Sequence, residues 1–236
     1  MNDIINFEIN ECNRHLVGYN ENVRDLTIPE TFIIDDITYR VKSIHSNAFG
    51  LCENLEHVTL PESITNIGDG AFNGCHNLIT INLPVKLQRL GSWAFANCFN
   101  LETINIPKRI QSIESFTFID CLSLKEVIIN NGIKTINNSV FSGCENLIEI
   151  NIPKSVTRIG VNSFRRCTEL KHISMYNRVE MICEGAFDRC NNLTITYYGS
   201  FNKWSKIKPI NVNRRLYARN IIQFIKLDEE ITSNNA

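Results

Sequence analysis

Apolar residues are distributed periodically along this chain. Three residue types recur at a constant spacing of 23 residues between positions 49 and 193. They are Phe49, Phe72, Phe95, Phe118, Phe141, Phe164 and Phe187; Cys52, Cys75, Cys98, Cys121, Cys144, Cys167 and Cys190; and Leu55, Leu78, Leu101, Leu124, Leu147, Leu170 and Leu193. Aliphatic columns follow each leucine, beginning at Val58, Leu60, Ile64 and Ile67. Seven recurrences in each of three columns predict an array of internal repeats.

Each unit reads A-F-x-x-C-x-N-L-x-x-I-x-L-P-x-x-I-x-x-I-G-x-x. The alternation of buried-type and polar residues over Val58, Thr59 and Leu60 predicts a strand with one buried face. Proline follows this strand in most units and ends it, because it lacks an N–H and fixes φ. The A-F-x-x-C stretch has helical spacing, since Phe and Cys lie three positions apart. The I-x-x-I-G stretch predicts a second, shorter extended segment.

One such unit cannot bury its apolar columns alone, whereas stacked units close a continuous core. We therefore predict an α/β solenoid of the leucine-rich repeat class, with 23-residue coils, parallel strands and short helical turns, capped at both ends. The repeat array occupies residues 48–196. Residues 1–47 form an N-terminal cap, with a hairpin over 5–28 that turns at Tyr19-Asn20-Glu21-Asn22, followed by an irregular first coil. Residues 197–236 form a C-terminal cap, in which Ser200 caps a short helix, residues 216–227 form a final strand and a flexible tail follows.

The repeat resembles the BspA-type leucine-rich repeat family, also described as Treponema pallidum-type repeats. The clearest copies are Ala48–Gly68, Ala71–Gly91 and Val140–Gly160, and the ending YYGSFNKWSKIKPIN is similar to a terminal cap often seen in that family. The resemblance extends over residues 20 to 227. It implies a cell-surface or secreted module for adhesion and protein interaction.

Composition narrows the function further. The chain has 43% hydrophobic and 21% charged residues and a net charge of −1, so no global field recruits nucleic acid or an anionic membrane. No secretory signal is evident, and no stretch approaches the roughly 20 apolar residues that span a bilayer. The chain as written is therefore expected to be cytoplasmic, whereas the family resemblance implies a surface or secreted location.

Seven of the nine cysteines share one column flanked by apolar columns, which favours stacked buried thiols over disulfides or zinc. Cys183 stands where several other units have glycine, so we expect it to be more exposed, and a reactive thiol is the alternative. The five histidines fit no metal or acid–base spacing, and no phosphate-binding, dinucleotide-binding or hydrolase motif is present. We therefore expect no enzyme activity and no cofactor.

Function in a solenoid resides in the outward strand positions, where neighbouring coils form a grid of side chains. Ile79, Ile128 and Ile148 are apolar at positions where solvent is expected, within a field rich in Asn and Thr, and such a mixed patch suits protein recognition. The plainer interpretation is scattered surface hydrophobic residues among tolerated strand residues. The predicted partner-binding residues are Glu56, His57, Thr59, Ile79, Thr80, Asn82, Glu102, Thr103, Asn105, Lys125, Glu126, Ile128, Ile148, Glu149, Asn151, Lys171 and His172.

Two further patterns have structural or alternative readings. Asparagine recurs just before the repeat leucine, at Asn54, Asn77, Asn100, Asn146 and Asn192, where amides bond the backbone of the turn and of the adjacent coil. A basic run with aromatic residues lies near the C-terminus: Lys203, Lys206, Lys208, Arg214, Arg215, Arg219 and Lys226. One interpretation of this run, and the alternative function for the chain, is binding of nucleic acid or anionic surfaces. The other interpretation is a cap whose aromatic residues pack on the last coil and whose charges are solvated.

Overall fold

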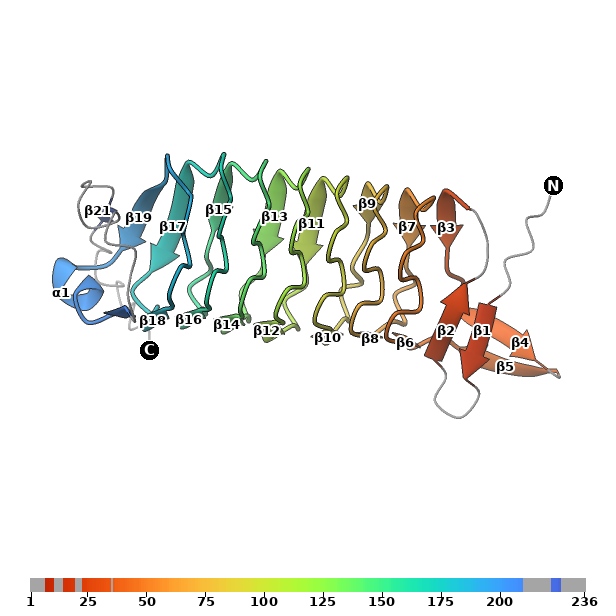
Figure 1. Ribbon diagram of the computed structural model, residues 1–236. Coiled ribbons are helices and arrows are strands. Elements are labelled where there is room, and N and C mark those ends of the chain that lie inside the picture. The colour runs from red at the N-terminus through yellow and green to blue at the C-terminus, as the bar shows by residue number, and fades with distance from the viewer. Residues whose placement is uncertain (1–6, 11–14, 20–22, 35, 210–221, 226–236) are drawn as a thin grey trace, which may run out of the picture.

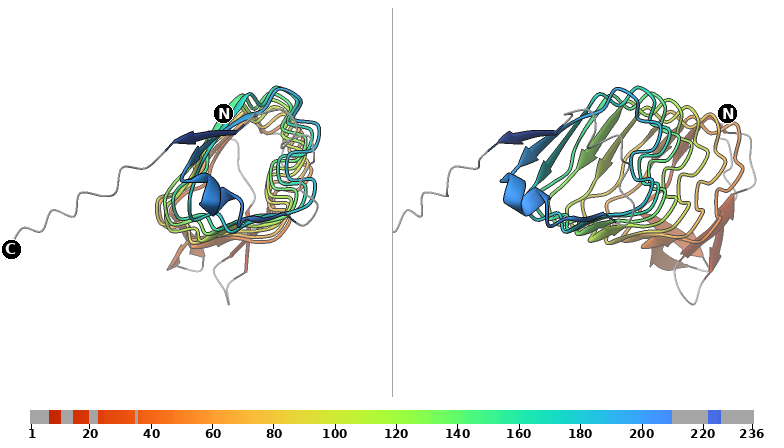
Figure 2. Two further views of the ribbon diagram at one scale, coloured as in Figure 1. Left: turned by 90° about the vertical axis from the view of Figure 1, so that its left-hand side faces the viewer. Right: turned by 60° about the vertical axis from the view of Figure 1, so that its left-hand side comes forward.

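The chain forms a solenoid whose coils stack along one long axis (Figure 1). The computed structural model describes residues 7–10, 15–19, 23–34, 36–209 and 222–225. Viewed along the axis, successive coils superimpose in one closed outline, and the apolar columns fill its interior (Figure 2). The 23-residue period therefore corresponds to one turn of the solenoid, as predicted.

Two ladders of parallel strands run the length of the solenoid. The first ladder contains the strand of the L-x-x-I-x-L stretch: β3 (Asp25–Thr27), β7 (His57–Thr59), β9 (Thr80–Ile81), β11 (Thr103–Ile106), β13 (Glu126–Ile129), β15 (Glu149–Asn151), β17 (His172–Tyr176), β19 (Thr194–Tyr198) and β21 (Ile222–Ile225). The second ladder contains the I-x-x-I stretch: β6 (Ser43–Ile44), β8 (Asn66–Ile67), β10 (Arg89–Leu90), β12 (Ser112–Ile113), β14 (Thr135–Ile136), β16 (Arg158–Ile159), β18 (Met181–Ile182) and β20 (Lys208–Pro209).

Neither ladder is continuous. Hydrogen-bonded pairing in the first ladder stops between β9 and β11 and again between β13 and β15. In the second ladder it stops between β10 and β12. In most other pairs of the array, residues 23 positions apart are partners, as Asn105 is to Ile128 and Thr135 is to Arg158, whereas β17 and β19 pair 22 positions apart.

The predicted helical turn over A-F-x-x-C is wrong, and with it the α/β class. The segment is a turn in which main-chain amides bond alternately to the next coil and to their own coil. Phe72 N donates to Ala94 O of the next coil at 2.8 Å, whereas Asn73 N donates to Gly70 O of the same coil at 2.9 Å. A left-handed residue stands at each end, here Gly70 (φ 63°) and Gly74 (φ 76°), and such residues do not continue a right-handed helix. The one α-helix in the described part of the chain is α1 (Phe201–Trp204).

The phenylalanine column forms a continuous stack through the core. All seven rings are buried, and neighbouring rings lie nearly parallel. The ring centroids are 5.1 Å apart for Phe49 and Phe72 and 5.6 Å apart for Phe164 and Phe187. This spacing matches the separation of adjacent strands, so the stack and the ladders share one repeat distance.

The cysteine column is a ladder of free thiols, as predicted. Each thiol from Cys75 to Cys190 donates to the carbonyl of the phenylalanine one coil before it, for example Cys121 Sγ to Phe95 O at 3.2 Å. Burial raises the pKa of the Cys98 and Cys144 thiols well above the ordinary value. The thiols therefore stay neutral and act as small apolar residues with one useful donor.

Because the thiolate is the reactive form, we expect the buried thiols to resist alkylation in the native state. At pH 8, Cys52 and Cys190, which are partly exposed, should react first among the described thiols. Cys75, Cys98, Cys121, Cys144 and Cys167 should react only after urea unfolds the chain. Mass spectrometry of iodoacetamide-labelled peptides measures this. Equal labelling rates for all thiols in the folded protein would contradict the buried ladder.

The N-terminal region contains a hairpin, but its turn is elsewhere than predicted. β1 (Phe7–Asn10) pairs antiparallel with β2 (His15–Tyr19), so the chain reverses between residues 10 and 15. Tyr19 is the last residue of β2, and Asn20, Glu21 and Asn22 lie outside the described residues. β2 pairs parallel with β6 and thereby joins the second ladder. A second hairpin, β4 (Thr31–Ile34) with β5 (Ile37–Arg40), accounts for the extra residues before the regular coils.

At the other end, α1 follows β19, and Ser200 is its N-cap, as the sequence predicts. The Ser200 hydroxyl accepts a hydrogen bond from Lys203 N at 3.3 Å. Trp204 is buried and packs edge-on against Tyr197, with ring centroids 5.0 Å apart. Trp204 of α1 thus contacts the last coil, whereas Phe201 is exposed, and Arg214, Arg215, Arg219 and Lys226 lie outside the described residues.

Candidate partner-binding face

The predicted partner-binding residues all lie on the outer face of the first ladder. β11 and β13 each show the alternating pattern of an exposed residue followed by a buried one. Of the seventeen predicted residues, fourteen are exposed, and Glu56, Ile79 and His172 are partly buried. The strands carry these residues along one side of the solenoid (Figure 1), and their role in partner binding stays a prediction.

Part of this grid is engaged in bonds within the solenoid. Asn82 bonds both main-chain groups of Leu60, accepting from its N–H at 2.7 Å and donating to its carbonyl at 3.0 Å. Glu56 accepts from Arg24 Nε at 2.9 Å. The His57 ring contacts Thr80 Oγ1 at 2.8 Å through Nδ1. The N-terminal end of the face is therefore largely satisfied by its own neighbours.

Strand pairing in the first ladder is interrupted between β13 and β15, within the predicted grid. In most other coils, a main-chain N–H just before the strand donates to a main-chain carbonyl of the previous coil. Examples are Lys125 N to Glu102 O at 2.8 Å and Lys171 N to Ile148 O at 2.8 Å. The equivalent bond, from Ile148 N to Lys125 O, is not formed within the described chain. A hollow of about 410 Å³ lies at this interruption.

Six of the predicted residues line this hollow together: Lys125, Glu126, Ile128, Ile148, Glu149 and Asn151. Ile128 and Ile148 are 45% and 48% exposed, which is high for isoleucine. Ile79 differs, because it is partly buried and lies two coils away from Lys125. The structure therefore supports an apolar patch of two isoleucines rather than three.

The polar rim of the hollow is acidic on balance. Lys125 Nζ is paired with Glu102 Oε1 at 3.2 Å, so this cation is already neutralised. Glu126 and Glu149 are both exposed at the rim and occupy equivalent positions of consecutive coils. Two carboxylates one coil apart repel each other and attract a cation placed between them. The arrangement suits an apolar side chain with a basic group beside it.

Sequence reasoning missed the interruption between β13 and β15. Proline ends the first-ladder strand at Pro107 and Pro153, but Asn130 occupies the intervening position. Asn130 Nδ2 donates to Asn105 Oδ1 at 2.8 Å and to Ile106 O at 2.9 Å, which ties this coil to the one before it. A missing proline alone does not mark an interruption, because Tyr176 also replaces it and β17 still pairs with β19.

The asparagine column before the repeat leucine has the structural role predicted for it at two positions. Asn77 Nδ2 donates to Glu53 O of the previous coil at 2.8 Å, and Asn100 Nδ2 donates to Asn77 Oδ1 at 3.2 Å. These side chains link successive turns and are not available as a separate binding site.

The expectation that Cys183 is more exposed is wrong, because its side chain is 5% exposed and Arg158 Nη2 donates to its sulfur at 3.6 Å. No group of three or more His, Cys, Asp or Glu residues in the described chain is arranged to hold a metal ion. Among the described helices, none is long and apolar enough to cross a membrane.

A family model described as "BspA type Leucine rich repeat region" matches six copies over residues 19–148 and 89–213. The chain belongs to this family. The match confirms the resemblance inferred from the repeat, and it makes the BspA-type coil the unit from which the first-ladder face is built.

Solved structures share this fold. A leucine-rich repeat protein of T. pallidum is 24% identical, with a TM-score of 0.57 over 96% of this chain and 99% of that one. A leucine-rich repeat protein from Eubacterium ventriosum is 28% identical, with a TM-score of 0.70 over 82% of this chain. This BspA-type chain covers 50% of the Eubacterium structure. No curated protein matches the chain.

Proposed function

We propose that the chain is a non-enzymatic protein-binding module whose partner docks on the first-ladder face, centred on the hollow between β13 and β15. The observation that carries this proposal is the pair of exposed isoleucines, Ile128 and Ile148, at a hollow that six residues of the grid line. Exposed apolar residues ringed by polar ones are typical of recognition sites. Membership of the BspA-type family, whose members include interaction and adhesion modules, supports the same class of function.

The chemistry of the hollow suggests what the partner presents. An apolar side chain of the partner would bury Ile128 and Ile148, and a lysine or arginine beside it would pair with Glu126 and Glu149. Burial at such a centre carries most of the binding energy in protein interfaces, whereas charges at the rim contribute mainly to specificity and association rate. We therefore propose a partner segment with an apolar anchor and an adjacent basic residue.

Replacing both Ile128 and Ile148 by threonine is expected to weaken the interaction at least tenfold. The change removes apolar surface but keeps the branched Cβ that strands favour, so the fold should be retained. Burial of one isoleucine contributes about 1.5 to 3 kcal/mol, and roughly 1.4 kcal/mol corresponds to a tenfold change in Kd. A partner is first isolated by affinity capture on the wild-type chain. Calorimetric titration of the purified partner then measures Kd for each variant.

The matched control is Val85→Thr, because Val85 is 65% exposed, is branched at Cβ as isoleucine is, and lies between β9 and β10, outside the first ladder. This control should bind as the wild type does. A second variant, Glu126→Gln with Glu149→Gln, tests the acidic rim and should reduce the salt dependence of binding. Equal affinity of the wild type and the double isoleucine variant would place the binding site elsewhere and overturn the proposal.

Binding of nucleic acid or anionic surfaces through the basic C-terminal run is not supported by any contact of the described residues. Of this run, the structure describes the side chains of Lys203 and Lys206, and Trp204 between them is buried against Tyr197. We therefore propose the first-ladder face as the site and leave the C-terminal run as the less favoured candidate.

A further inference from the structure

A second opening lies on a different side of the solenoid, where the second ladder is interrupted between β10 and β12. On its N-terminal side, Gln88 N donates to Thr65 O at 2.8 Å and Gly91 N donates to Ile67 O at 3.0 Å. On its C-terminal side, Lys134 N donates to Gln111 O at 2.7 Å. The intervening pair of coils lacks the corresponding bonds.

The interruption leaves main-chain groups available on both of its walls. By the 23-residue period, Gln111 N should donate to Gln88 O, and Glu114 N should donate to Leu90 O. Neither bond is formed, and the structure records no other backbone partner for these two amides in the residues it describes. The interruption therefore leaves two amides on one wall and two carbonyls on the other without the bonds that close the ladder in neighbouring coils.

A hollow of about 780 Å³ lies at this interruption, and its charged lining is mainly basic. Four cations and one carboxylate line it: Arg89, Lys108, Arg109, Lys134 and Glu114. We call this hollow the basic cleft. Its residues come from three consecutive coils, so the cleft crosses the interruption instead of lying within one coil.

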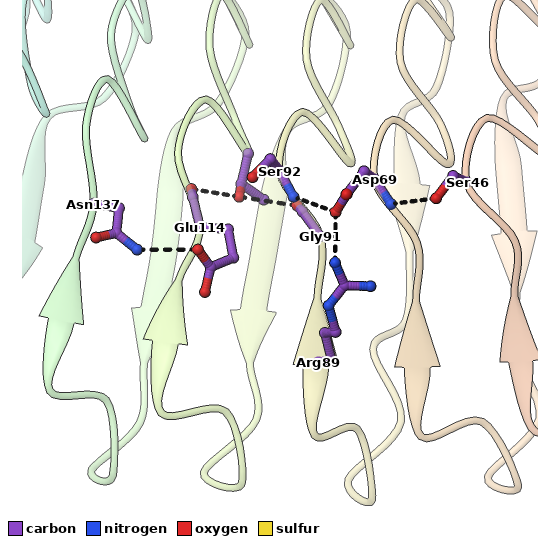
Figure 3. Close-up of polar contacts among 8 residues, drawn as sticks. Ser46, Asp69, Arg89, Gly91, Ser92, Glu114 and Asn137 are labelled. Carbon is purple, nitrogen blue, oxygen red and sulfur yellow. Dashed lines mark hydrogen bonds and ion pairs between the residues drawn. The ribbon is translucent and has the colours of Figure 1, made fainter.

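Two of the charged residues at the basic cleft are already engaged, as Figure 3 shows. Arg89 Nη2 is paired with Asp69 Oδ1 at 2.9 Å, and Glu114 Oε2 accepts from Asn137 Nδ2 at 3.2 Å. Lys108, Arg109 and Lys134 have no ion-pair partner within the part of the chain that the structure describes. The cleft thus has a net excess of unpaired positive charge.

Gly132 shapes the floor of the basic cleft. Its φ is +127°, a value that L side chains rarely adopt, and a Cβ built on it would lie 2.3 Å from Lys108 O. Gly132 occupies the same column as Arg109, one coil later. Glycine at this position therefore allows the main chain to approach Lys108 of the previous coil closely beside the basic cleft.

We propose that the basic cleft binds an extended acidic peptide, whose carboxylates pair with Lys108, Arg109 and Lys134 while its main chain bonds the open amides and carbonyls. A peptide supplies both donors and acceptors, which matches the two walls. A nucleic acid or sulfated glycan supplies mainly acceptors, which would leave the open carbonyls without donors. This site lies outside the first-ladder face and does not depend on the function proposed for that face.

Fluorescence anisotropy with a fluorescein-labelled peptide of alternating glutamate and serine tests the proposal. A peptide of the same length with glutamine in place of glutamate is the neutral probe. The acidic peptide should bind the wild-type chain, and Lys108→Ala with Arg109→Ala should weaken binding about tenfold. Both residues are exposed, so the thermal unfolding midpoint should change little. Lys134→Ala, on the next coil, repeats the test independently and should weaken binding in the same direction.

The matched control is Arg165→Ala with Arg178→Ala, which removes two exposed cations at other places and changes the net charge equally. This control should bind the acidic peptide within about twofold of the wild type, because distant exposed charges are screened. Three results would overturn the proposal: equal binding of the neutral peptide, equal weakening by the control, or preferential binding of a single-stranded oligonucleotide or heparin fragment that competes with the peptide at the cleft.

Discussion

Replacement of Phe118 by alanine is expected to lower the free energy of unfolding by about 3 to 5 kcal/mol. Phe118 is fully buried, and its ring lies between Phe95 and Phe141 at centroid distances of 5.5 and 5.6 Å. Truncation removes the apolar surface of the ring and leaves a cavity that the flanking coils cannot close without shortening the ladders. Stability in a solenoid depends on contacts between neighbouring repeats, so the loss also uncouples the two halves of the array.

Urea unfolding followed by circular dichroism measures this effect. The matched control is Phe201→Ala, because Phe201 is 66% exposed at α1, and its change should be less than about 1 kcal/mol. The uncoupling adds a second expected result, a broader or two-step transition for Phe118→Ala than for the wild type. A variant with wild-type stability and a single sharp transition would refute the stacked core.

Repeat length was the feature that the sequence predicted most securely, because it rests on side chains that face the core in every coil. Once the period is known, it also fixes the parallel register, since residues such as Thr135 and Arg158 are partners one period apart. The burial of the thiol column followed from the same reasoning. Each of these features depends on a pattern repeated seven times, so a single exception does not obscure it.

The local backbone conformation of the A-F-x-x-C segment was predicted poorly. Left-handed turns are recognisable where glycine occupies them, but Trp93 (φ 54°) and Phe116 (φ 64°) adopt the same conformation, which bulky residues rarely do. The turn is imposed on them by the bonds that neighbouring coils make, for example Phe95 N to Thr117 O at 2.9 Å. A local spacing of three between Phe and Cys cannot distinguish such a turn from a helix. The tertiary contacts decide the outcome.

The interruptions of the ladders explain why the candidate sites were only partly predicted. The sequence identified Ile128 and Ile148 as unusual, because an apolar residue at an outward position can be recognised from the repeat alone. It did not group them with Glu126 and Glu149 around one hollow, and it did not identify the basic cleft at all. Both openings arise from how two particular coils approach each other, and that spacing is a property of the packed array.

Replacement of Gly91 by alanine is expected to destabilise the fold, because neighbouring coils approach closely at this position. A Cβ built on Gly91 would lie 2.5 Å from Asp69 N and 2.6 Å from Gly68 C, which are main-chain atoms of the previous coil. No side-chain rotation relieves such a clash, so the coils must separate. We expect destabilisation of about 1 to 3 kcal/mol, the usual cost of overpacking, and loss of the bond from Gly91 N to Ile67 O.

Gly50→Ala is the matched control, because the nearest atom to a Cβ there is Asn47 O at 3.4 Å, an ordinary contact. That variant should be neutral or slightly stabilising, since alanine restricts the unfolded chain. Urea unfolding gives both free energies, and amide hydrogen exchange at Gly91 reports on the bond to Ile67. Equal stability of the two variants would show that coil spacing at Gly91 adjusts freely.

Gly91 belongs to a column in which some other coils carry a larger residue. Glu114, Asn137 and Cys183 occupy the same column as Gly91, so a side chain is tolerated where the preceding coil leaves room for it. Asn137 N still donates to Ile113 O at 3.0 Å, whereas Glu114 N faces the interruption at the basic cleft. If Gly91→Ala opens the ladder between β8 and β10, it should extend the basic cleft by one coil. The variant's affinity for the acidic peptide would then change together with its stability, and an unchanged affinity would show that the cleft depends on its cations alone.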